Sequence, residues 1–134
     1  LANDFEVFRA FCDAEIAMSA HVLFEAIDPY SAASTSKKLM DIIRNDIKFS
    51  GLLISDDISM AALPGDIKKR TTNLIEAGND IILHCNGKLF EMKEIIDSGV
   101  VPNTLTLSRM ASVIEERKKI EHTKIHNVES SQSS

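Results

Sequence analysis

Short apolar runs alternate along the chain with longer stretches in which apolar residues recur every three or four positions. The apolar runs, each of strand length, cover residues 16–20, 52–55 and 80–85. The stretches with helical spacing cover residues 4–12, 36–47, 67–75, 89–96 and a longer segment from 107 onward. Alternation of these two periods is typical of parallel sheets covered by helices. The pattern therefore predicts an α/β fold built on three buried strands.

Capping signals and spacing refine this prediction. Thr35 or Ser36 can cap the second helix, while Gly78 and Gly99 can end the third and fourth helices. The strands begin roughly 30 residues apart, which is about the length of one unit in a (β/α)8 barrel. Open, doubly wound sheets have βα units of similar length, so the spacing alone fits both architectures.

Composition and charge exclude several classes of protein. The 134 residues carry a formal net charge of −5, which disfavours non-specific binding to nucleic acid. No apolar run approaches the ~18 residues of a membrane helix, and the first residues lack the features of a signal peptide. We therefore expect neither a membrane protein nor a secreted one. Cys12 and Cys85 lie far apart and outside any Cys/His cluster, so neither a disulfide framework nor a structural zinc site is indicated.

Apolar residues become sparse near the C-terminus. Residues 122–134 end in the run Ser-Ser-Gln-Ser-Ser, a composition typical of disordered segments. We therefore predict one folded portion over residues 1–121, followed by a disordered tail.

Two adjacent acids, Asp56 and Asp57, follow the second apolar run directly. Active sites of parallel α/β proteins are built at the C-terminal ends of the strands. Because side chains alternate along a strand, the two carboxylates are expected to point in different directions and to have different roles. A carboxylate at this place can act as a nucleophile, a base or a metal ligand, or it can be a loop acid with no catalytic role.

Other polar residues at strand ends are weaker candidates. His21 follows the first run and can line the same site, although a histidine there is more often a hydrogen-bonded structural residue. His84 lies in the third run and is interpreted as packing. The sequence Asn86-Gly87-Lys88 can hold a phosphate at a helix start, but such a dipeptide is also a common turn former.

Three segments together resemble a known family. They are residues 17–22 (Ala-Met-Ser-Ala-His-Val), 51–60 (Gly-Leu-Leu-Ile-Ser-Asp-Asp-Ile-Ser-Met) and 77–86 (Ala-Gly-Asn-Asp-Ile-Ile-Leu-His-Cys-Asn). In this order and spacing they are similar to consecutive blocks of the bacterial β-N-acetylhexosaminidases of glycoside hydrolase family 3.

The resemblance implies a partial TIM (β/α)8 barrel, comprising about the last three βα units and a C-terminal helix. It implies a retaining mechanism in which Asp56 is the nucleophile and Asp57 supports it, with His21 and Met60 lining the substrate. The implied substrate is a terminal β-linked N-acetylglucosamine in a glycan or muropeptide, handled during peptidoglycan recycling in the cytoplasm. No metal or organic cofactor is implied.

The sequence also departs from that family. It contains neither the Lys-His-Phe-Pro-Gly-His-Gly block that binds sugar nor the later Asp-x-His pair that serves as general acid/base. We therefore expect a truncated enzyme with little or no activity alone, which would need a missing N-terminal half. The alternative from another class is a non-catalytic α/β module, either receiver-like or phosphate-binding.

Overall fold

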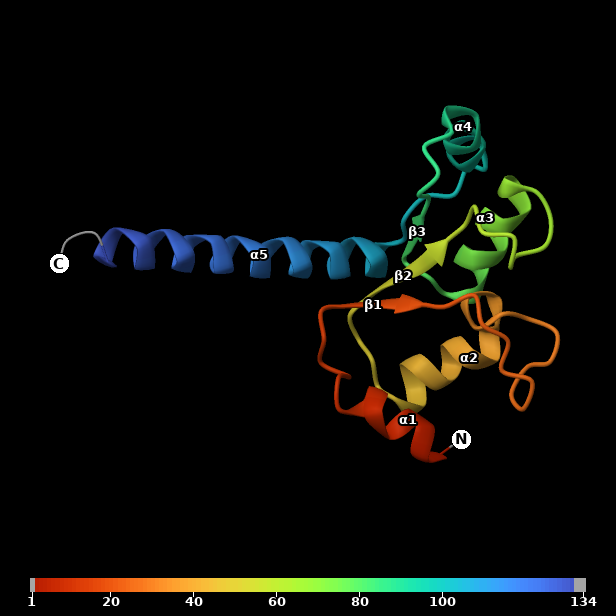
Figure 1. The fold of residues 1–134 in the computed structure, drawn as a ribbon, viewed down its shortest axis with the longest axis horizontal. Coiled ribbons are helices and arrows are strands. Elements are labelled where there is room, and N and C mark those ends of the chain that lie inside the picture. Colours follow the sequence, from red (N-terminus) through yellow and green to blue (C-terminus); the bar gives the residue numbers. More distant parts are fainter. Residues whose placement is uncertain (1, 132–134) are drawn as a thin grey trace. The chain divides into compact units, whose positions relative to one another are not determined.

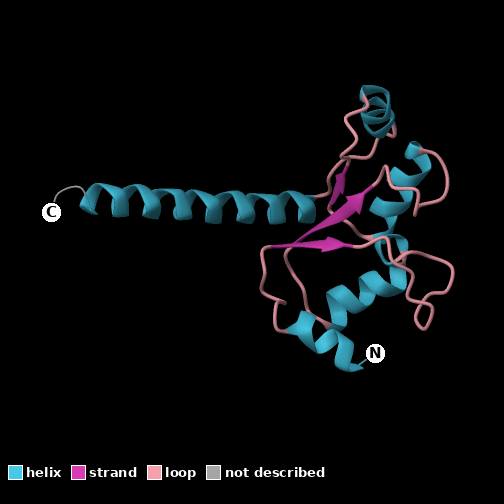
Figure 2. Cartoon of the chain, viewed as in Figure 1, coloured by secondary structure: helices cyan, strands magenta, loops and turns pink. Residues whose placement is uncertain are grey.

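The computed structural model describes the backbone of residues 2–131 and the side chains of residues 5–121. The chain consists of two compact units, Leu1–Pro102 and Asn103–Ser134. Within the described residues, the first unit holds the three strands and four α-helices, and the second unit contains one helix (Figures 1 and 2).

The first unit is built on a parallel sheet of three strands in the order β1-β2-β3 (Figure 2). The strands are β1 (Ile16–Ser19), β2 (Leu52–Asp57) and β3 (Ile81–Leu83). Ile16 pairs with Leu52, and Ile54 pairs with Ile81. The predicted α/β class and the three predicted strands are therefore confirmed, although β3 is shorter than the apolar run that contains it.

Helices precede, separate and follow these strands. They are α1 (Ala2–Arg9), the 3-10 turn η1 (Ala33–Thr35), α2 (Lys37–Asp41), the π-helical turn η2 (Ile42–Asp46), α3 (Ile67–Ala77) and α4 (Leu89–Asp97). Ser36 caps α2 by accepting a hydrogen bond from the Leu39 amide at 3.3 Å. Gly78 ends α3 with a φ of 127°, a conformation that glycine adopts without a steric penalty. The capping predictions for α2 and α3 are thus confirmed, and Gly99, the predicted end of α4, has a φ of 74° two residues after Asp97.

The core lies between β2 and the helices. On one side, Leu53 packs in a cluster whose other buried members are Met40, Ile47, Phe49 and Ala77. Ile58, Leu63 and Leu74 form a second buried cluster between the segment after β2 and α3. β2 is therefore the central strand, with its first residues in one buried cluster and the segment that follows it in the other.

The prediction that β1 is a buried strand is wrong for two of its side chains. Ile16 is 39% exposed and Met18 is 58% exposed. The reason is that β1 is an edge strand, paired only with β2 within the described residues. An apolar run of four or five residues has the same sequence pattern at the edge of a sheet as in its centre.

The described part of the second unit contains the helix α5 (Thr104–Ser131). Its backbone is helical through residue 131, so it includes ten residues of the predicted tail, and the boundary after residue 121 stays a prediction. No glycine or proline interrupts residues 104–131, and a low apolar content does not by itself break a helix. Residues 132–134 of the predicted tail lie outside the described part. Among the described helices, none combines the length and the hydropathy needed to cross a bilayer.

Candidate active site

The predicted acid pair lies at the C-terminal end of β2, where the pairing with β3 is irregular. Ile54 pairs with Ile81 and Asp57 pairs with Leu83, so β2 has one more residue than β3 in this interval. An extra residue of this kind is a β-bulge, which bends the strand and changes the direction of its side chains. Asp56 therefore lies within a local distortion of the sheet rather than in a regular strand.

Ser55 fills the gap that this bulge leaves in the ladder. Its side chain has no exposed surface. The Oγ atom accepts a hydrogen bond from the Leu83 amide at 3.2 Å and donates one to the carbonyl of Asp56 at 2.8 Å. The Ser55 hydroxyl thus replaces a backbone acceptor for the Leu83 amide of β3 and a backbone donor for the Asp56 carbonyl of β2. The second of these bonds fixes the peptide group that follows Asp56.

The two carboxylates have different surroundings, as the alternation of side chains predicts. Asp56 is half-buried, and its Oδ1 atom accepts a hydrogen bond from the Asp57 amide at 2.8 Å. Asp57 instead accepts hydrogen bonds from the amide and the hydroxyl of Ser59, at 3.0 and 2.7 Å, and from the amide of Cys85 at 3.1 Å. Asp57 therefore connects the turn after β2 to the segment after β3.

The charge of Asp57 is stabilised by these contacts. Burial raises the pKa of the Asp57 carboxyl, but the hydrogen bonds from Ser59 and Cys85 outweigh that effect and hold the pKa below its usual value. The carboxylate oxygens of Asp57 thus accept hydrogen bonds from the protein itself, and its supporting role in catalysis stays a prediction. Asp56, with a single backbone donor, keeps acceptor capacity for another partner.

His21 contacts the backbone of the acid pair. One ring nitrogen, Nδ1, lies 2.6 Å from the hydroxyl of Ser34, and the other, Nε2, lies 3.1 Å from the carbonyl oxygen of Asp57. Both polar atoms of the ring are therefore engaged with the protein. That His21 lines the substrate stays a prediction.

Arg70 on α3 holds the turn that contains Met60. Its Nη1 atom donates to the carbonyls of Ile58 and Met60, each at 3.0 Å, and its Nε atom donates to the carbonyl of Gly65 at 2.9 Å. Met60 itself is 42% exposed, and its place along the substrate stays a prediction. Sequence reasoning missed Arg70, because an arginine on a helix gives no sign that it will reach three carbonyls of the preceding loop.

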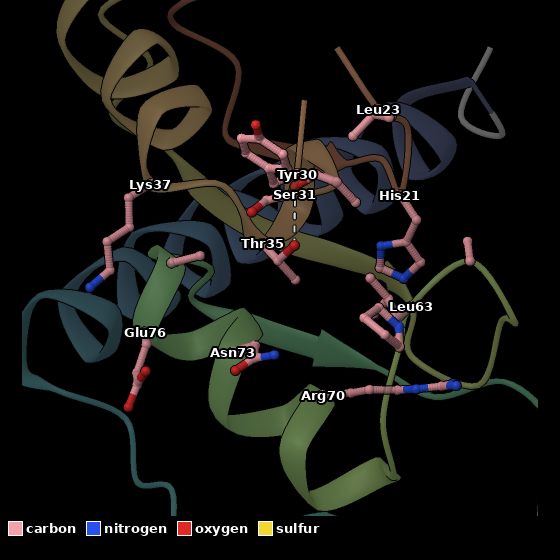
Figure 3. A pocket seen from close by; sticks show the side chains of 14 residues that line it. His21, Leu23, Tyr30, Ser31, Thr35, Lys37, Leu63, Arg70, Asn73 and Glu76 are labelled. Carbon is pink, nitrogen blue, oxygen red and sulfur yellow. Dashed lines mark hydrogen bonds between the residues drawn. The ribbon is translucent and has the colours of Figure 1, made fainter. Parts of the chain in front are cut away.

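A pocket of about 500 Å³ lies beside this turn (Figure 3). His21 and Arg70 lie toward one end of the pocket, and Lys37 and Glu76 lie toward the other (Figure 3). Neither Asp56 nor Asp57 is among its lining residues. The pocket therefore borders the residues that hold the acid pair, not the carboxylates themselves.

The segment after β3 forms a separate polar cluster. The carboxylate of Glu91 forms hydrogen bonds with the side chains of His84, at 2.9 Å, and Asn86, at 2.7 Å. It also forms an ion pair with Lys88 at 3.2 Å. Hydrogen bonds from His84 and then Asn86 lower the pKa of Glu91 to about 2, against the opposing effect of burial. Gly87 adopts a φ of 74°, in line with the turn interpretation of the Asn-Gly pair. These contacts anchor the start of α4 to the end of β3.

The structure also describes both cysteines and the possible metal ligands. Cys12 and Cys85 are free thiols. Across the described side chains, no group of three or more His, Cys, Asp and Glu residues is arranged to hold a metal ion.

Comparisons with known proteins agree with the family resemblance. The sequence matches the family model described as the glycosyl hydrolase family 3 N terminal domain over residues 2–115. The beta-hexosaminidase of Nitrosomonas eutropha is 40% identical over 88 residues, which cover 63% of this chain and 25% of that protein. The beta-hexosaminidase of Vibrio cholerae is 35% identical over 115 residues, which cover 80% of this chain and 34% of that protein.

Solved structures of family 3 enzymes have the same fold over most of this chain. NagZ from Neisseria gonorrhoeae superposes with a TM-score of 0.65 at 30% identity, over 80% of this chain and 33% of that one. A family 3 beta-N-acetylglucosaminidase from Paenibacillus gives a TM-score of 0.73 at 23% identity, over 83% of this chain and 24% of that one, and so shows the fold alone.

The chain spans about a quarter to a third of the length of the curated relatives described above. The family model nevertheless covers nearly all of the chain, including every strand and the acid pair. By this match, the chain belongs to glycosyl hydrolase family 3, and its residues 2–115 correspond to the N-terminal domain of that family.

Proposed function

We propose that this chain supplies the nucleophile of a retaining β-N-acetylhexosaminidase, and that Asp56 is that nucleophile. The observation that carries the proposal is the position of Asp56. It lies at the C-terminal end of the central strand of a parallel sheet, in a bulge, with a carboxylate bound by a single backbone amide. In parallel α/β folds this is where catalytic side chains are placed.

The chemistry needs a free carboxylate oxygen. In the first step an oxygen of Asp56 attacks the anomeric carbon, and the glycosidic bond breaks as the leaving oxygen takes a proton from a general acid. In the second step water, deprotonated by the same group, displaces Asp56 and releases the sugar. Asp57 would remain ionised throughout and hold the turn, since its oxygens are bound by Ser59 and Cys85.

The sheet is proposed to be part of a TIM (β/α)8 barrel, comprising about its last three βα units. The three strands are parallel and follow their order in the sequence, as consecutive barrel units do. An apolar groove of about 550 Å³, which includes Phe8, Phe11, Ile16 and Met18, adjoins the open edge at β1. A preceding part of the barrel, either in the same polypeptide or in a separate one, would cover this groove.

The substrate is proposed to be a terminal β-linked N-acetylglucosamine. Support comes from the names of the relatives, which are beta-hexosaminidases and beta-N-acetylglucosaminidases. Recycling of muropeptides from peptidoglycan in the bacterial cytoplasm is the role proposed with it.

The isolated chain is proposed to have little or no turnover. Its 134 residues contain neither a Lys-His-Phe-Pro-Gly-His-Gly block nor an Asp-x-His pair after such a block. General acid/base catalysis commonly contributes about 10²–10⁴-fold to the rate, and loss of sugar contacts weakens binding of the transition state further.

A chimeric barrel tests the proposal. In it, residues 15–115 of this chain replace the matching segment of the Vibrio cholerae relative. We expect the chimera to release the chromophore from a chromogenic N-acetylglucosaminide. We expect Asp56→Asn to abolish this turnover, and Glu25→Gln, a control at an exposed position, to leave it unchanged. A folded chimera without turnover, or with unchanged turnover in Asp56→Asn, would contradict it. Robust turnover by the isolated chain would overturn only the proposal of low activity.

The receiver-like alternative is not favoured. Receiver-like domains need an additional acid at another strand end, but β3 is followed by His84 and Cys85. The phosphate-binding alternative is weakened as well, because the Lys88 ammonium is already paired with Glu91.

A further inference from the structure

His21 connects the backbone of the acid pair to a buried part of the protein. Its Nε2 atom lies 3.1 Å from the carbonyl oxygen of Asp57, and its Nδ1 atom lies 2.6 Å from the hydroxyl of Ser34. A carbonyl oxygen can only accept, so Nε2 must carry a proton. In the neutral ring Nδ1 is then an acceptor, and the hydroxyl of Ser34 donates to it. The two partners together define a single neutral tautomer.

The Ser34 end of this connection is firmly held. Ser34 has no exposed surface, and its amide donates to the carbonyl of Ala20 at 3.1 Å. The carbonyl of Ser34 accepts a hydrogen bond from the side chain of Asn79 at 2.7 Å, and Asn79 in turn accepts one from the hydroxyl of Ser19 at 2.5 Å. Ser34 is thus tied to the end of β1 and to the segment that precedes β3.

The other end of the connection reaches Asp56 through one residue. The amide of Asp57 donates a hydrogen bond to the carboxylate of Asp56 at 2.8 Å. The carbonyl of Asp57 accepts hydrogen bonds from Nε2 of His21 and from the amide of Met60, each at 3.1 Å. Movement of the Asp57 backbone would therefore turn the donor that orients the Asp56 carboxylate.

We propose that His21 is a positioning residue for Asp56. Through its Nε2–H it holds the carbonyl of Asp57, and the amide of the same residue then fixes the direction of the Asp56 carboxylate. This inference rests on the proposed function for its catalytic meaning, since it is as nucleophile that Asp56 needs a fixed direction. It gives His21 a role distinct from contact with the substrate.

Two substitutions separate the two hydrogen bonds of the ring. In His21→Gln the terminal amide can reach the position of Nε2 and keep the bond to Asp57. In His21→Asn the shorter amide matches Nδ1, so it keeps the bond to Ser34 but loses the bond to Asp57. Both variants of the full 134-residue chain are compared with the wild type by NMR.

The carboxyl ¹³C signal of Asp56 and the hydrogen exchange of the Met60 amide are the measurements. We expect the Asp56 signal to move in His21→Asn and to return toward its wild-type position in His21→Gln. Exchange of the Met60 amide should become about tenfold faster in His21→Asn alone, because one hydrogen bond to the shared carbonyl is lost. If His21 had only a packing role, both substitutions would change the Asp56 signal and the Met60 exchange rate to the same extent. That outcome would overturn the proposal.

The wild-type protein supplies a test that does not depend on the folding of any variant. The ¹⁵N shifts of the neutral His21 ring should show a protonated Nε2 and an unprotonated Nδ1, and Ser34→Ala should broaden or shift the Nδ1 signal while Nε2 stays protonated. The opposite tautomer would contradict the proposal. None of these signals depends on turnover, so an inactive chimera with the expected signals would refute the proposed reaction and leave the positioning of Asp56 intact.

Discussion

The Nη2 atom of Arg44 lies 2.8 Å from the Oδ2 atom of Asp80, and this oxygen also accepts a hydrogen bond from the Leu53 amide at 2.9 Å. The side chain of Asp80 is only 4% exposed. Arg44 further donates to the carbonyls of Phe49 and Gly51, at 3.1 and 2.8 Å. One buried ion pair therefore connects η2, the start of β2 and the residue before β3.

Removal of Arg44 should destabilise the first unit strongly. Arg44→Met leaves the carboxylate of Asp80 buried without its cation, and breaking a buried pair in this way typically costs about 3–5 kcal/mol. Arg9→Met is the control, because the pair of Arg9 with Glu6 is exposed and such pairs contribute less than about 1 kcal/mol. Urea unfolding followed by circular dichroism measures both losses. Equal decreases in the free energy of unfolding for Arg44→Met and Arg9→Met would show that the buried pair contributes no more to stability than the exposed one.

The hydroxyl of Ser55 should stabilise the bulge that carries Asp56. In Ser55→Ala the half-buried Leu83 amide loses its partner at 3.2 Å. A fully buried unpaired donor costs about 1–3 kcal/mol, so we expect a loss of about 1 kcal/mol here. Thr72→Ala is the control, since the hydroxyl of Thr72 makes a solvent-exposed hydrogen bond to the carbonyl of Lys68 in the same helix and we expect a change of about 0.5 kcal/mol or less. Unfolding curves give both values. A loss in Ser55→Ala no larger than in the control would show that the bulge forms without the hydroxyl.

Periodicity and capping chemistry were sufficient to predict the fold class. The apolar runs at 16–20 and 52–55 became strands, Ser36 became a helix cap and Gly78 a helix end, because each of these outcomes depends on a few neighbouring residues. The position of the acid pair followed from the same reasoning, since the end of a strand is a local feature.

The contacts that hold the acid pair depend on residues far apart in the sequence. His21 meets the carbonyl of Asp57 36 positions later, and Ser55 meets the amide of Leu83 28 positions later. Periodicity carries no information about such pairs. The exposure of Met18 was unpredictable for a related reason, as it depends on whether another strand pairs with β1.

The contribution of Glu91 to stability should disappear in acid. Its carboxyl has a pKa of about 2 in the folded protein, because His84 and Asn86 bind the charged form, against an ordinary value of 4.5. A depressed pKa stabilises the folded state above the ordinary value, and that stabilisation is lost as the pH falls from about 4.5 toward about 2. Glu91→Gln should therefore be less stable than the wild type at neutral pH, and the difference should shrink as the pH falls through this window.

Unfolding by urea at about pH 7, about pH 4 and about pH 2.5 measures this difference. Glu94→Gln, at an exposed position of the same helix, controls for the loss of one negative charge. A difference between Glu91→Gln and the wild type that stays constant from neutral pH to the lowest pH would refute the assigned role of the carboxylate.

The open edge of the sheet predicts self-association of the isolated chain. β1 presents an unpaired edge within the described residues, next to the exposed side chains of Ile16 and Met18, and such edges pair readily with other chains. Met18→Lys places a charge on this edge, which opposes pairing, whereas Val101→Lys adds the same charge at a position that is 78% exposed and outside every strand. Sedimentation velocity should therefore show dimers or larger species for the wild type and for Val101→Lys, and mostly monomer for Met18→Lys. A wild-type chain that stays monomeric at all concentrations, or equal effects of the two lysines, would show that the β1 edge does not cause association.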